Sequence, residues 1–268
     1  MRLWHQGRIE LERMPAYRRL LEEHFARVAE PETTVDLHGM APGTYATDYP
    51  GSDLRFPSVT YLHSLQVLRN AQQAERDGYD GILLMNLPET VQEEAQSLVD
   101  IPVVSYAQAS MYAAAMLGRR FAILAMIEEL IPLYEAHVAR HGMESRAWGV
   151  VPLGLDHTTV FASFENPEPV TTHVAARVRE LAAQGVDVVI PGEAPVNMVL
   201  AAGGLTRVDE VPIVDALAAT LKFGEAMVRL ASVCGVRAAR TGYFSARPPA
   251  GRMEELARFY RLDEFGAS

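Results

Sequence analysis

The segment GYDGILLMNLP at residues 78–88 aligns without a gap on GVDVVIPGEAP at residues 185–195. In both segments a Gly and an Asp precede an apolar run and a Pro follows it, so that Asn86 falls on Glu193. Short apolar runs bounded by turn residues are typical of buried strands. The repeat therefore predicts two similar α/β halves. A chance similarity between two generic α/β units is the alternative interpretation.

A second pair of segments extends the repeat. IPVVS at residues 101–105 corresponds to VPIVD at residues 211–215, and an alanine-rich helical pattern follows each. We expect strands at 102–105 and 212–214. Along the whole chain, short apolar runs alternate with longer helical patterns, which indicates a mostly parallel sheet. We predict an α/β fold of two pseudo-symmetric parallel-sheet lobes with the active-site cleft between them. The first lobe is expected to comprise residues 1–108 plus 214–268, and the second residues 109–213.

Composition and charge narrow the class of protein. The chain has 268 residues, 49% of them apolar and 22% charged, which is inconsistent with a disordered or collagen-like chain. The formal net charge is −10 and the 24 Lys and Arg residues are scattered, so no nucleic-acid partner is expected. No apolar run reaches the roughly 18 to 20 residues that cross a bilayer, and the N-terminus lacks an apolar signal-peptide segment. We expect no membrane association and a cytoplasmic location.

Motifs for cofactors and metals are missing from the sequence. The one cysteine, Cys234, cannot form an internal disulfide. No Cys-x-x-Cys pair occurs, although His5, His38, Glu193 and Asp215 could converge from a distance. Phosphate-loop, dinucleotide and Gly-x-Ser-x-Gly motifs are absent as well. We therefore expect neither a metal nor a cofactor.

Several segments carry a resemblance to a known family. They are residues 101–104, ASMYAAAMLGRRF at 109–121, VPIVDALAATLK at 211–222 and GVRAARTG at 235–242. On these segments the chain resembles the aspartate/glutamate/hydantoin racemase superfamily, most closely its hydantoin racemase branch. The resemblance implies a two-lobed, cofactor-independent isomerase with a small-molecule substrate. The acidic composition and the alanine-rich helices permit a dimer or a larger ring, and we expect a homo-oligomer.

The sequence departs from that family at the reacting residues. Such racemases place a cysteine after a strand in each half, so that one thiolate removes a proton and the other thiol returns one from the opposite face. Asn86 and Glu193 occupy the corresponding positions, and the two-thiol reaction cannot operate in this chain. We expect Glu193 to be a general base, because burial raises a carboxyl pKa toward neutrality. Asn86 is expected to polarise a carbonyl. Alternatively, Glu193 and Asn86 belong to ordinary helix N-termini.

Other candidate site residues follow predicted strands. His5 lies where the resemblance places a ligand-binding loop, and we expect it to be a third catalytic residue, as acid or base. The predicted substrate-binding residues are Gln6, His38, Tyr45, Ser105, Tyr106, Gly192, Ala194 and Asp215. Aromatic residues in the long loop at 39–58 either close over a ligand or fix the loop to the core. Asp215 is alternatively a helix N-cap.

Three functions remain open from the sequence. The first is an isomerase-type enzyme that moves a proton next to a carbonyl of a small acid or a cyclic amide or imide, with Glu193 as its single general base. The second is a hydrolase or lyase on a small cyclic amide or carbonyl compound, in which Glu193 activates water. The third is a non-catalytic binding protein that retained the cleft.

Overall fold

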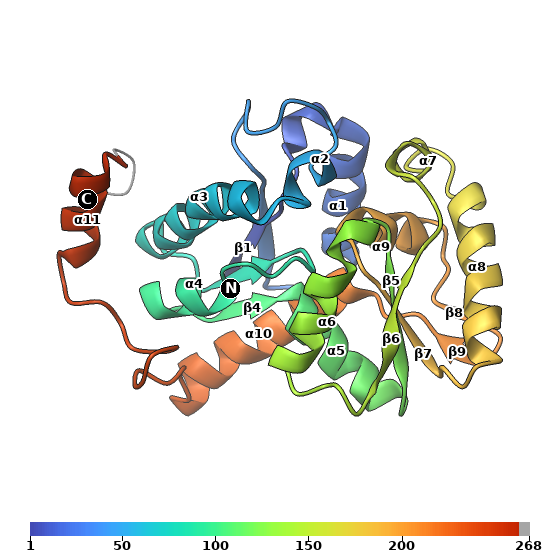
Figure 1. Cartoon of the computed structure of the whole chain (residues 1–268). Helices are drawn as coiled ribbons and strands as arrows, with labels where there is room; N and C mark the ends of the chain where they lie inside the picture. Colours follow the sequence, from blue (N-terminus) through green and yellow to red (C-terminus); the bar gives the residue numbers. More distant parts are fainter. Residues whose placement is uncertain (263–268) are drawn as a thin grey trace.

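The computed structural model describes residues 1–262, and the strands of its two lobes form two parallel sheets (Figure 1). Within these residues the first sheet has four strands in the order β2-β1-β3-β4, and the second has three in the order β6-β5-β7. The strands are β1 (Arg2–Gln6), β2 (Thr34–His38), β3 (Gly81–Leu84), β4 (Val103–Ser105), β5 (Phe121–Ala125), β6 (Ala147–Pro152) and β7 (Val188–Pro191). The predicted α/β fold with a parallel sheet in each lobe is confirmed.

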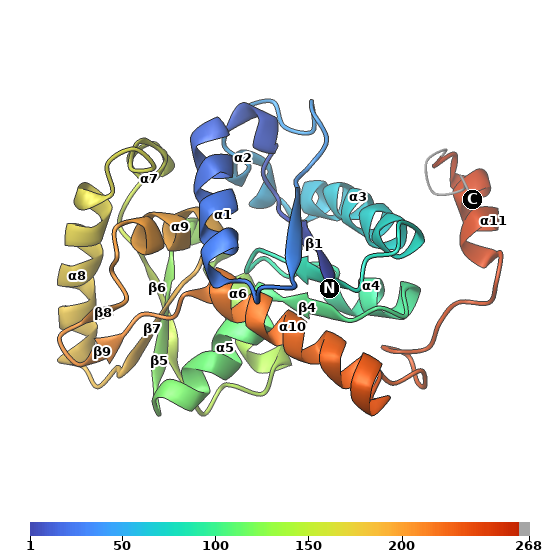
Figure 2. The same cartoon turned by 180° about the vertical axis from the view of Figure 1, so that it is seen from behind.

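Helices surround both sheets (Figures 1 and 2). In Figure 1, α3 and α4 lie beside the first sheet, whereas α6, α7, α8 and α9 lie beside the second. The helices of the first part of the chain are α1 (Pro15–Val28), α2 (Gly51–Leu54), α3 (Pro57–Arg76), α4 (Gln92–Leu98) and α5 (Tyr106–Leu117). The remaining helices are α6 (Ile131–Arg140), α7 (His157–Ala162), α8 (Glu168–Ala182), α9 (Ala194–Ala202), α10 (Ala216–Cys234) and α11 (Arg252–Tyr260), and two short 3-10 turns lie at Leu11–Arg13 and Glu128–Leu130. Among the described residues, no helix is both long enough and apolar enough to span a membrane.

The two sheets repeat one strand order. β1 lies between β2 and β3, as β5 lies between β6 and β7. β4 pairs with β3, and at the corresponding place beside β7 Ile213 forms a single parallel bridge with Val189. The strand predicted over 212–214 is therefore reduced to this bridge. The residues before Ile213 instead form a small antiparallel pair, in which β8 (Arg207–Val208) pairs with β9 (Val211–Pro212).

Helices α5 and α10 hold the two halves together. α5 follows β4 but contacts β7 of the other sheet, and α10 contacts β3, β4 and α5. Both helices begin with a side-chain cap: Ser105 Oγ accepts from the Gln108 N–H and Asp215 Oδ1 accepts from the Ala218 N–H. Buried residues of both lobes form one continuous hydrophobic cluster. The lobe boundaries near 108/109 and 213/214 stay a prediction.

Gly192 follows β7 where the chain passes very close to β5. Its N–H donates to the Leu124 carbonyl at 2.8 Å, and a Cβ built on Gly192 would lie 2.6 Å from that same oxygen. The nearest atoms all belong to the backbone of Leu124 and Ala125 in β5, which leaves no room for a methyl group.

We expect Gly192→Ala to lower the free energy of unfolding by about 1–3 kcal/mol, because overpacking forces the backbone to shift. Urea unfolding measures this difference. The matched control is Gly149→Ala in β6, where a built Cβ meets nothing within 4 Å. That variant should stay within about 0.5 kcal/mol of wild type. Equal stability of the two variants would contradict the close approach at Gly192.

Candidate active site

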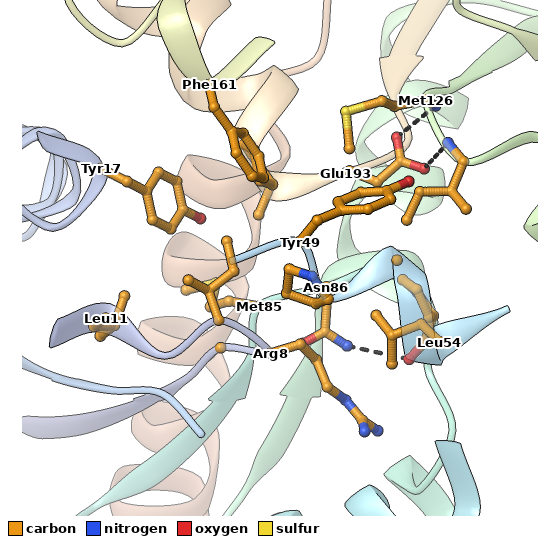
Figure 3. Close-up of a pocket in the computed structure, with 18 of the residues that line it drawn as sticks. Arg8, Leu11, Tyr17, Tyr49, Leu54, Met85, Asn86, Met126, Phe161 and Glu193 are labelled. Carbon is orange, nitrogen blue, oxygen red and sulfur yellow. Dashed lines mark hydrogen bonds between the residues drawn. The ribbon is translucent and has the colours of Figure 1, made fainter. Parts of the chain in front are cut away.

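One cavity lies where strands of both lobes end. The carboxyl ends of parallel strands are where α/β proteins bind ligands. Residues one to three positions after β1, β3, β5 and β7 contribute to the wall, namely 7–8, 85–86, 126–127 and 193–194. The cavity has a volume of about 60 Å³. Asn86 and Glu193, which the internal repeat places at equivalent positions, therefore line the same space from opposite lobes (Figure 3).

Apolar and aromatic side chains close most of the remaining wall. The aromatic members are Tyr17, Tyr49 and Phe161. Tyr49 comes from the first lobe, and its ring stacks on His157 of α7 with centroids 3.8 Å apart. In Figure 3 the Tyr49 ring lies between Glu193 and Asn86. This loop residue therefore packs against the second lobe and covers the space between the two polar side chains.

Glu193 is the only carboxylate of the cavity wall among residues 1–262. It is 5% exposed and accepts three hydrogen bonds. The Met126 N–H donates to Oε2 at 2.8 Å, the Ile127 N–H to Oε1 at 3.2 Å, and the Tyr134 hydroxyl to Oε1 at 2.8 Å. Because a carboxylate has about four lone-pair positions, Oε2 keeps one that can take a proton.

Burial and hydrogen bonding act on Glu193 in opposite directions. Burial raises its pKa, whereas the two backbone N–H groups and the Tyr134 hydroxyl lower it by stabilising the anion. Burial dominates, and the pKa of Glu193 rises to about 7. The carboxyl group can therefore both accept and return a proton near neutral pH, which suits general acid–base chemistry.

Asn86 presents an amide to the same cavity. Its Nδ2 donates one hydrogen bond, to the Pro88 carbonyl at 3.1 Å, and the amide has a second N–H. The predicted capping alternative does not apply in its simple form, because α4 begins only at Gln92 and Val91 occupies its N-cap position. A neutral amide in this place can donate to a carbonyl oxygen that gains negative charge.

His5 lines the cavity from β1. Its Nδ1 lies 3.0 Å from the His38 carbonyl oxygen, and because a carbonyl only accepts, Nδ1 carries the proton. Nε2 is then a lone-pair acceptor, and it is buried without a partner in the described part of the chain. Burial lowers the pKa of His5 to about 4, so the ring is neutral at pH 7. It can accept a hydrogen bond but is a poor proton donor.

Three predicted substrate-binding residues lie behind the cavity wall. The Gln6 side chain accepts hydrogen bonds from Trp4 Nε1 at 3.1 Å and Asn70 Nδ2 at 2.9 Å. The His38 ring stacks on Trp4 with centroids 3.3 Å apart. Side chains alternate along a strand, so Trp4 and Gln6 point to the face of β1 opposite His5. Tyr45 is buried against His63, and the structure does not bring these three side chains to the cavity.

Four other predicted residues support the strand ends instead of facing the cavity. Ser105 and Asp215 are the helix caps described above, and Asp215 also contacts His24 Nε2 at 3.3 Å. The buried Tyr106 hydroxyl donates to the Pro191 carbonyl at 2.7 Å, and Gly192 packs against β5. Of the predicted substrate-binding residues, Ala194 lines the cavity.

The sequence prediction missed two polar residues of the site: Arg8 lines the cavity, and Tyr134 donates to Glu193 from α6. Tyr49, one of the aromatic residues of the loop at 39–58 for which two roles were open, lines the cavity. Arg8 follows β1 by two residues, as Asn86 and Glu193 follow β3 and β7 by two, so the same strand-end rule could have found it. Tyr134 is distant in sequence and carries no such signal. Across residues 1–262, no three His, Cys, Asp or Glu side chains are grouped to hold a metal ion.

Comparison with known proteins places this geometry in a family. The family model for Asp/Glu/Hydantoin racemase matches residues 15–224. The chain belongs to the Asp/Glu/hydantoin racemase family. A racemase family is a family of isomerases that act on small molecules, and this chain is an enzyme of that class.

Relatives and solved structures agree with the assignment. A hydantoin racemase from Pseudomonas sp. (strain NS671) is 26% identical over 179 residues, which are 63% of this chain and 67% of that protein. The allantoin racemase from Klebsiella pneumoniae has a TM-score of 0.76 at 20% identity, covering 93% of this chain and 94% of that one. The allantoin racemase from Pseudomonas fluorescens has a TM-score of 0.71 at 21% identity, covering 93% and 97%. These structures share the two-lobed fold.

The cavity wall formed by residues 1–262 contains no thiol. Asn86 and Glu193 occupy the two strand ends, and Cys234 is exposed at the end of α10. Any proton transfer in the cavity must therefore use other groups, and Glu193 is the group whose pKa lies near neutrality.

The raised pKa of Glu193 predicts a pH dependence of stability. Between its ordinary pKa of 4.5 and about 7 the folded chain holds this proton more tightly than the unfolded chain. The stability contribution of Glu193 is thus fully present below pH 4.5 and is lost as the pH rises through 7. We expect the stability of wild type relative to Glu193→Gln to fall by up to about 3 kcal/mol between pH 5 and 8.

Urea unfolding at both pH values, on wild type and Glu193→Gln, measures this change. Glu210→Gln, at a side chain that is 97% exposed, is the matched control and should follow wild type at each pH. A pH-independent difference between wild type and Glu193→Gln would mean that Glu193 ionises normally.

Proposed function

We propose that this chain is a cofactor-independent isomerase that moves a proton at the carbon next to a carbonyl of a hydantoin-like cyclic amide or imide, with Glu193 as its single base. The observation that carries the proposal is a buried carboxyl group with a pKa of about 7 at the converging strand ends of both lobes. The relatives named hydantoin racemase and allantoin racemase support the choice of a cyclic ureide or related ring.

The reaction is a proton transfer between Glu193 and the substrate carbon. The free lone pair of Oε2 takes the proton, and the electron pair of the C–H bond moves into the carbonyl to give an enolate. The second N–H of Asn86 donates to the enolate oxygen, where negative charge develops. The protonated Glu193 then returns the proton, and its pKa near 7 makes both directions accessible.

The arrangement of polar groups limits the stereochemical course. A single base works on one face of the substrate carbon. His5, which comes from the other lobe, is neutral and has committed its Nδ1 proton to the His38 carbonyl. A shift of the proton to a neighbouring atom needs only Glu193, whereas inversion needs the planar enol to turn over or to take a proton from water.

We expect wild type to exchange the ring-carbon hydrogen of 5-substituted hydantoins in D2O, followed by NMR. The rate should rise with pH through about 7 and then level off, because the ionised carboxylate is the base. Glu193→Gln should slow the exchange by at least about 100-fold, the usual contribution of a positioned base.

Glu210→Gln is again the matched control and should exchange at the wild-type rate. Full activity of Glu193→Gln would overturn the assignment of the base. A ring-opened product would instead show that Glu193 activates water for hydrolysis. Tight ligand binding without exchange or ring opening would identify a binding protein.

A reaction without thiols has its own test. We expect Cys234→Ala, and wild type treated with iodoacetamide, to keep exchange rates within about twofold of untreated wild type, because an exposed thiol outside the cavity takes no part. The same exchange assay measures both. Loss of activity on alkylation that the Cys234→Ala variant escapes would show that the thiol contributes.

A further inference from the structure

The structure buries a positive charge beside the cavity. Arg8 lines the wall directly after β1 and is 6% exposed. Its Nη2 donates to Ser64 Oγ at 3.0 Å and to Thr90 Oγ1. Burial lowers the pKa of Arg8 to about 10, so the guanidinium is still charged at neutral pH. Its hydrogen-bond partners are therefore hydroxyl groups, which carry no compensating charge.

A counter-charge for Arg8 is missing in the described part of the chain. No carboxylate of residues 1–262 lies within ion-pair distance of its guanidinium, and Nη1 is buried without any hydrogen-bond partner. The acidic side chains of nearby segments are used elsewhere. Glu10 accepts from the N–H groups of Gly43 and Tyr45, and Asp53 contacts His63. Burying a guanidinium without a counter-charge lowers the stability of the fold, so such a group is typical of a functional site.

A second unpaired donor belongs to the same region. The Tyr45 hydroxyl is buried without a partner, and Tyr45 and Arg8 act on each other electrostatically. Burial raises the pKa of Tyr45 beyond its usual range, so the hydroxyl keeps its proton and remains a donor. Together with Ser64 and Thr90, these groups form a polar region that has two unused donors and one uncompensated positive charge.

We propose that Arg8 binds a carboxylate of the substrate, so that the natural substrate is an acidic ring compound such as a hydantoin that bears a carboxylate side chain. Hydrogen bonds between a guanidinium and a carboxylate are charge-assisted and strong, and Nη1 of Arg8 has no partner in the described part of the chain. The inference deepens the proposed function and rests on it for the identity of the ring.

The position of Arg8 relative to Glu193 suits such a substrate. In Figure 3 the guanidinium and the Glu193 carboxylate lie at opposite ends of the drawn site, with Tyr49 and Asn86 between them. A substrate carboxylate held at Arg8 is thereby kept away from the negative charge of Glu193. The reacting carbon can then lie next to Glu193 while its carbonyl faces Asn86.

Two isosteric probes test the charge preference directly: 5-carboxymethylhydantoin and its neutral amide, 5-carbamoylmethylhydantoin. Calorimetric titration measures their Kd values with wild type, Arg8→Gln and Arg8→Lys. We expect wild type to bind the acid at least about tenfold more tightly than the amide, because hydrogen bonds between charged groups are the strong ones. Arg8→Gln should lose the preference while binding the amide as wild type does, and Arg8→Lys should keep part of it.

The matched control is Arg18→Gln, at an exposed arginine paired with Glu22, which should retain the wild-type preference. Equal affinity of wild type for acid and amide would overturn the proposal, as would an undiminished preference in Arg8→Gln. If Arg8→Gln does not fold, wild type and Arg8→Lys still decide the matter.

Repeating the titrations in Glu193→Gln separates this proposal from the proposed function. The preference for the acid should persist there, since it needs Arg8 and not the base. If wild type prefers the acid to the amide but exchanges no deuterium, the role of Arg8 is supported and the proton-transfer reaction is contradicted.

Discussion

The exchange of α5 and α10 between the two halves is the constraint on which the site depends. Each helix follows one half of the repeat and packs on the other half's sheet or helices. One hydrophobic cluster consequently runs through both lobes, and the carboxyl ends of the two sheets are held toward a common cavity. Ser105 and Asp215 begin the two helices by the same capping interaction. They belong to the framework that aligns the strand ends.

The electrostatics of the cavity follow from that arrangement. Glu193 is buried because it sits between lobes that share a core, and it is tolerated there because two peptide N–H groups after β5 and the Tyr134 hydroxyl point at its oxygens. Had burial acted alone, the group would be a neutral acid; had the donors acted alone, it would be a weak base. Their balance places the pKa of Glu193 near neutrality.

The chain has the fold of its family, and the two strand ends that line its cavity carry unlike groups. Asn86 and Glu193 differ in kind, since one offers only hydrogen bonds and the other a titrating proton. A pair of identical groups suits a reaction that is symmetric between two faces, whereas an unlike pair suits a reaction with one base and one site for a developing oxyanion. Arg8 adds a positive charge to the site, and in Figure 3 its guanidinium lies at the end opposite the Glu193 carboxylate.

The sequence by itself determined the class of fold and the pairing of Asn86 with Glu193. A gap-free repeat of strand, turn and helix entry is a local pattern, and it is readable without knowing how the halves meet. Tertiary structure alone decided which aromatic residue of the loop at 39–58 lines the cavity, namely Tyr49. It also decided that Tyr134 donates to Glu193, and that His38 and Gln6 face away from the cavity. It also reduced the strand expected at 212–214 to one bridge. These features depend on contacts between segments far apart in the chain, and on the burial that sets each pKa, neither of which a local pattern encodes.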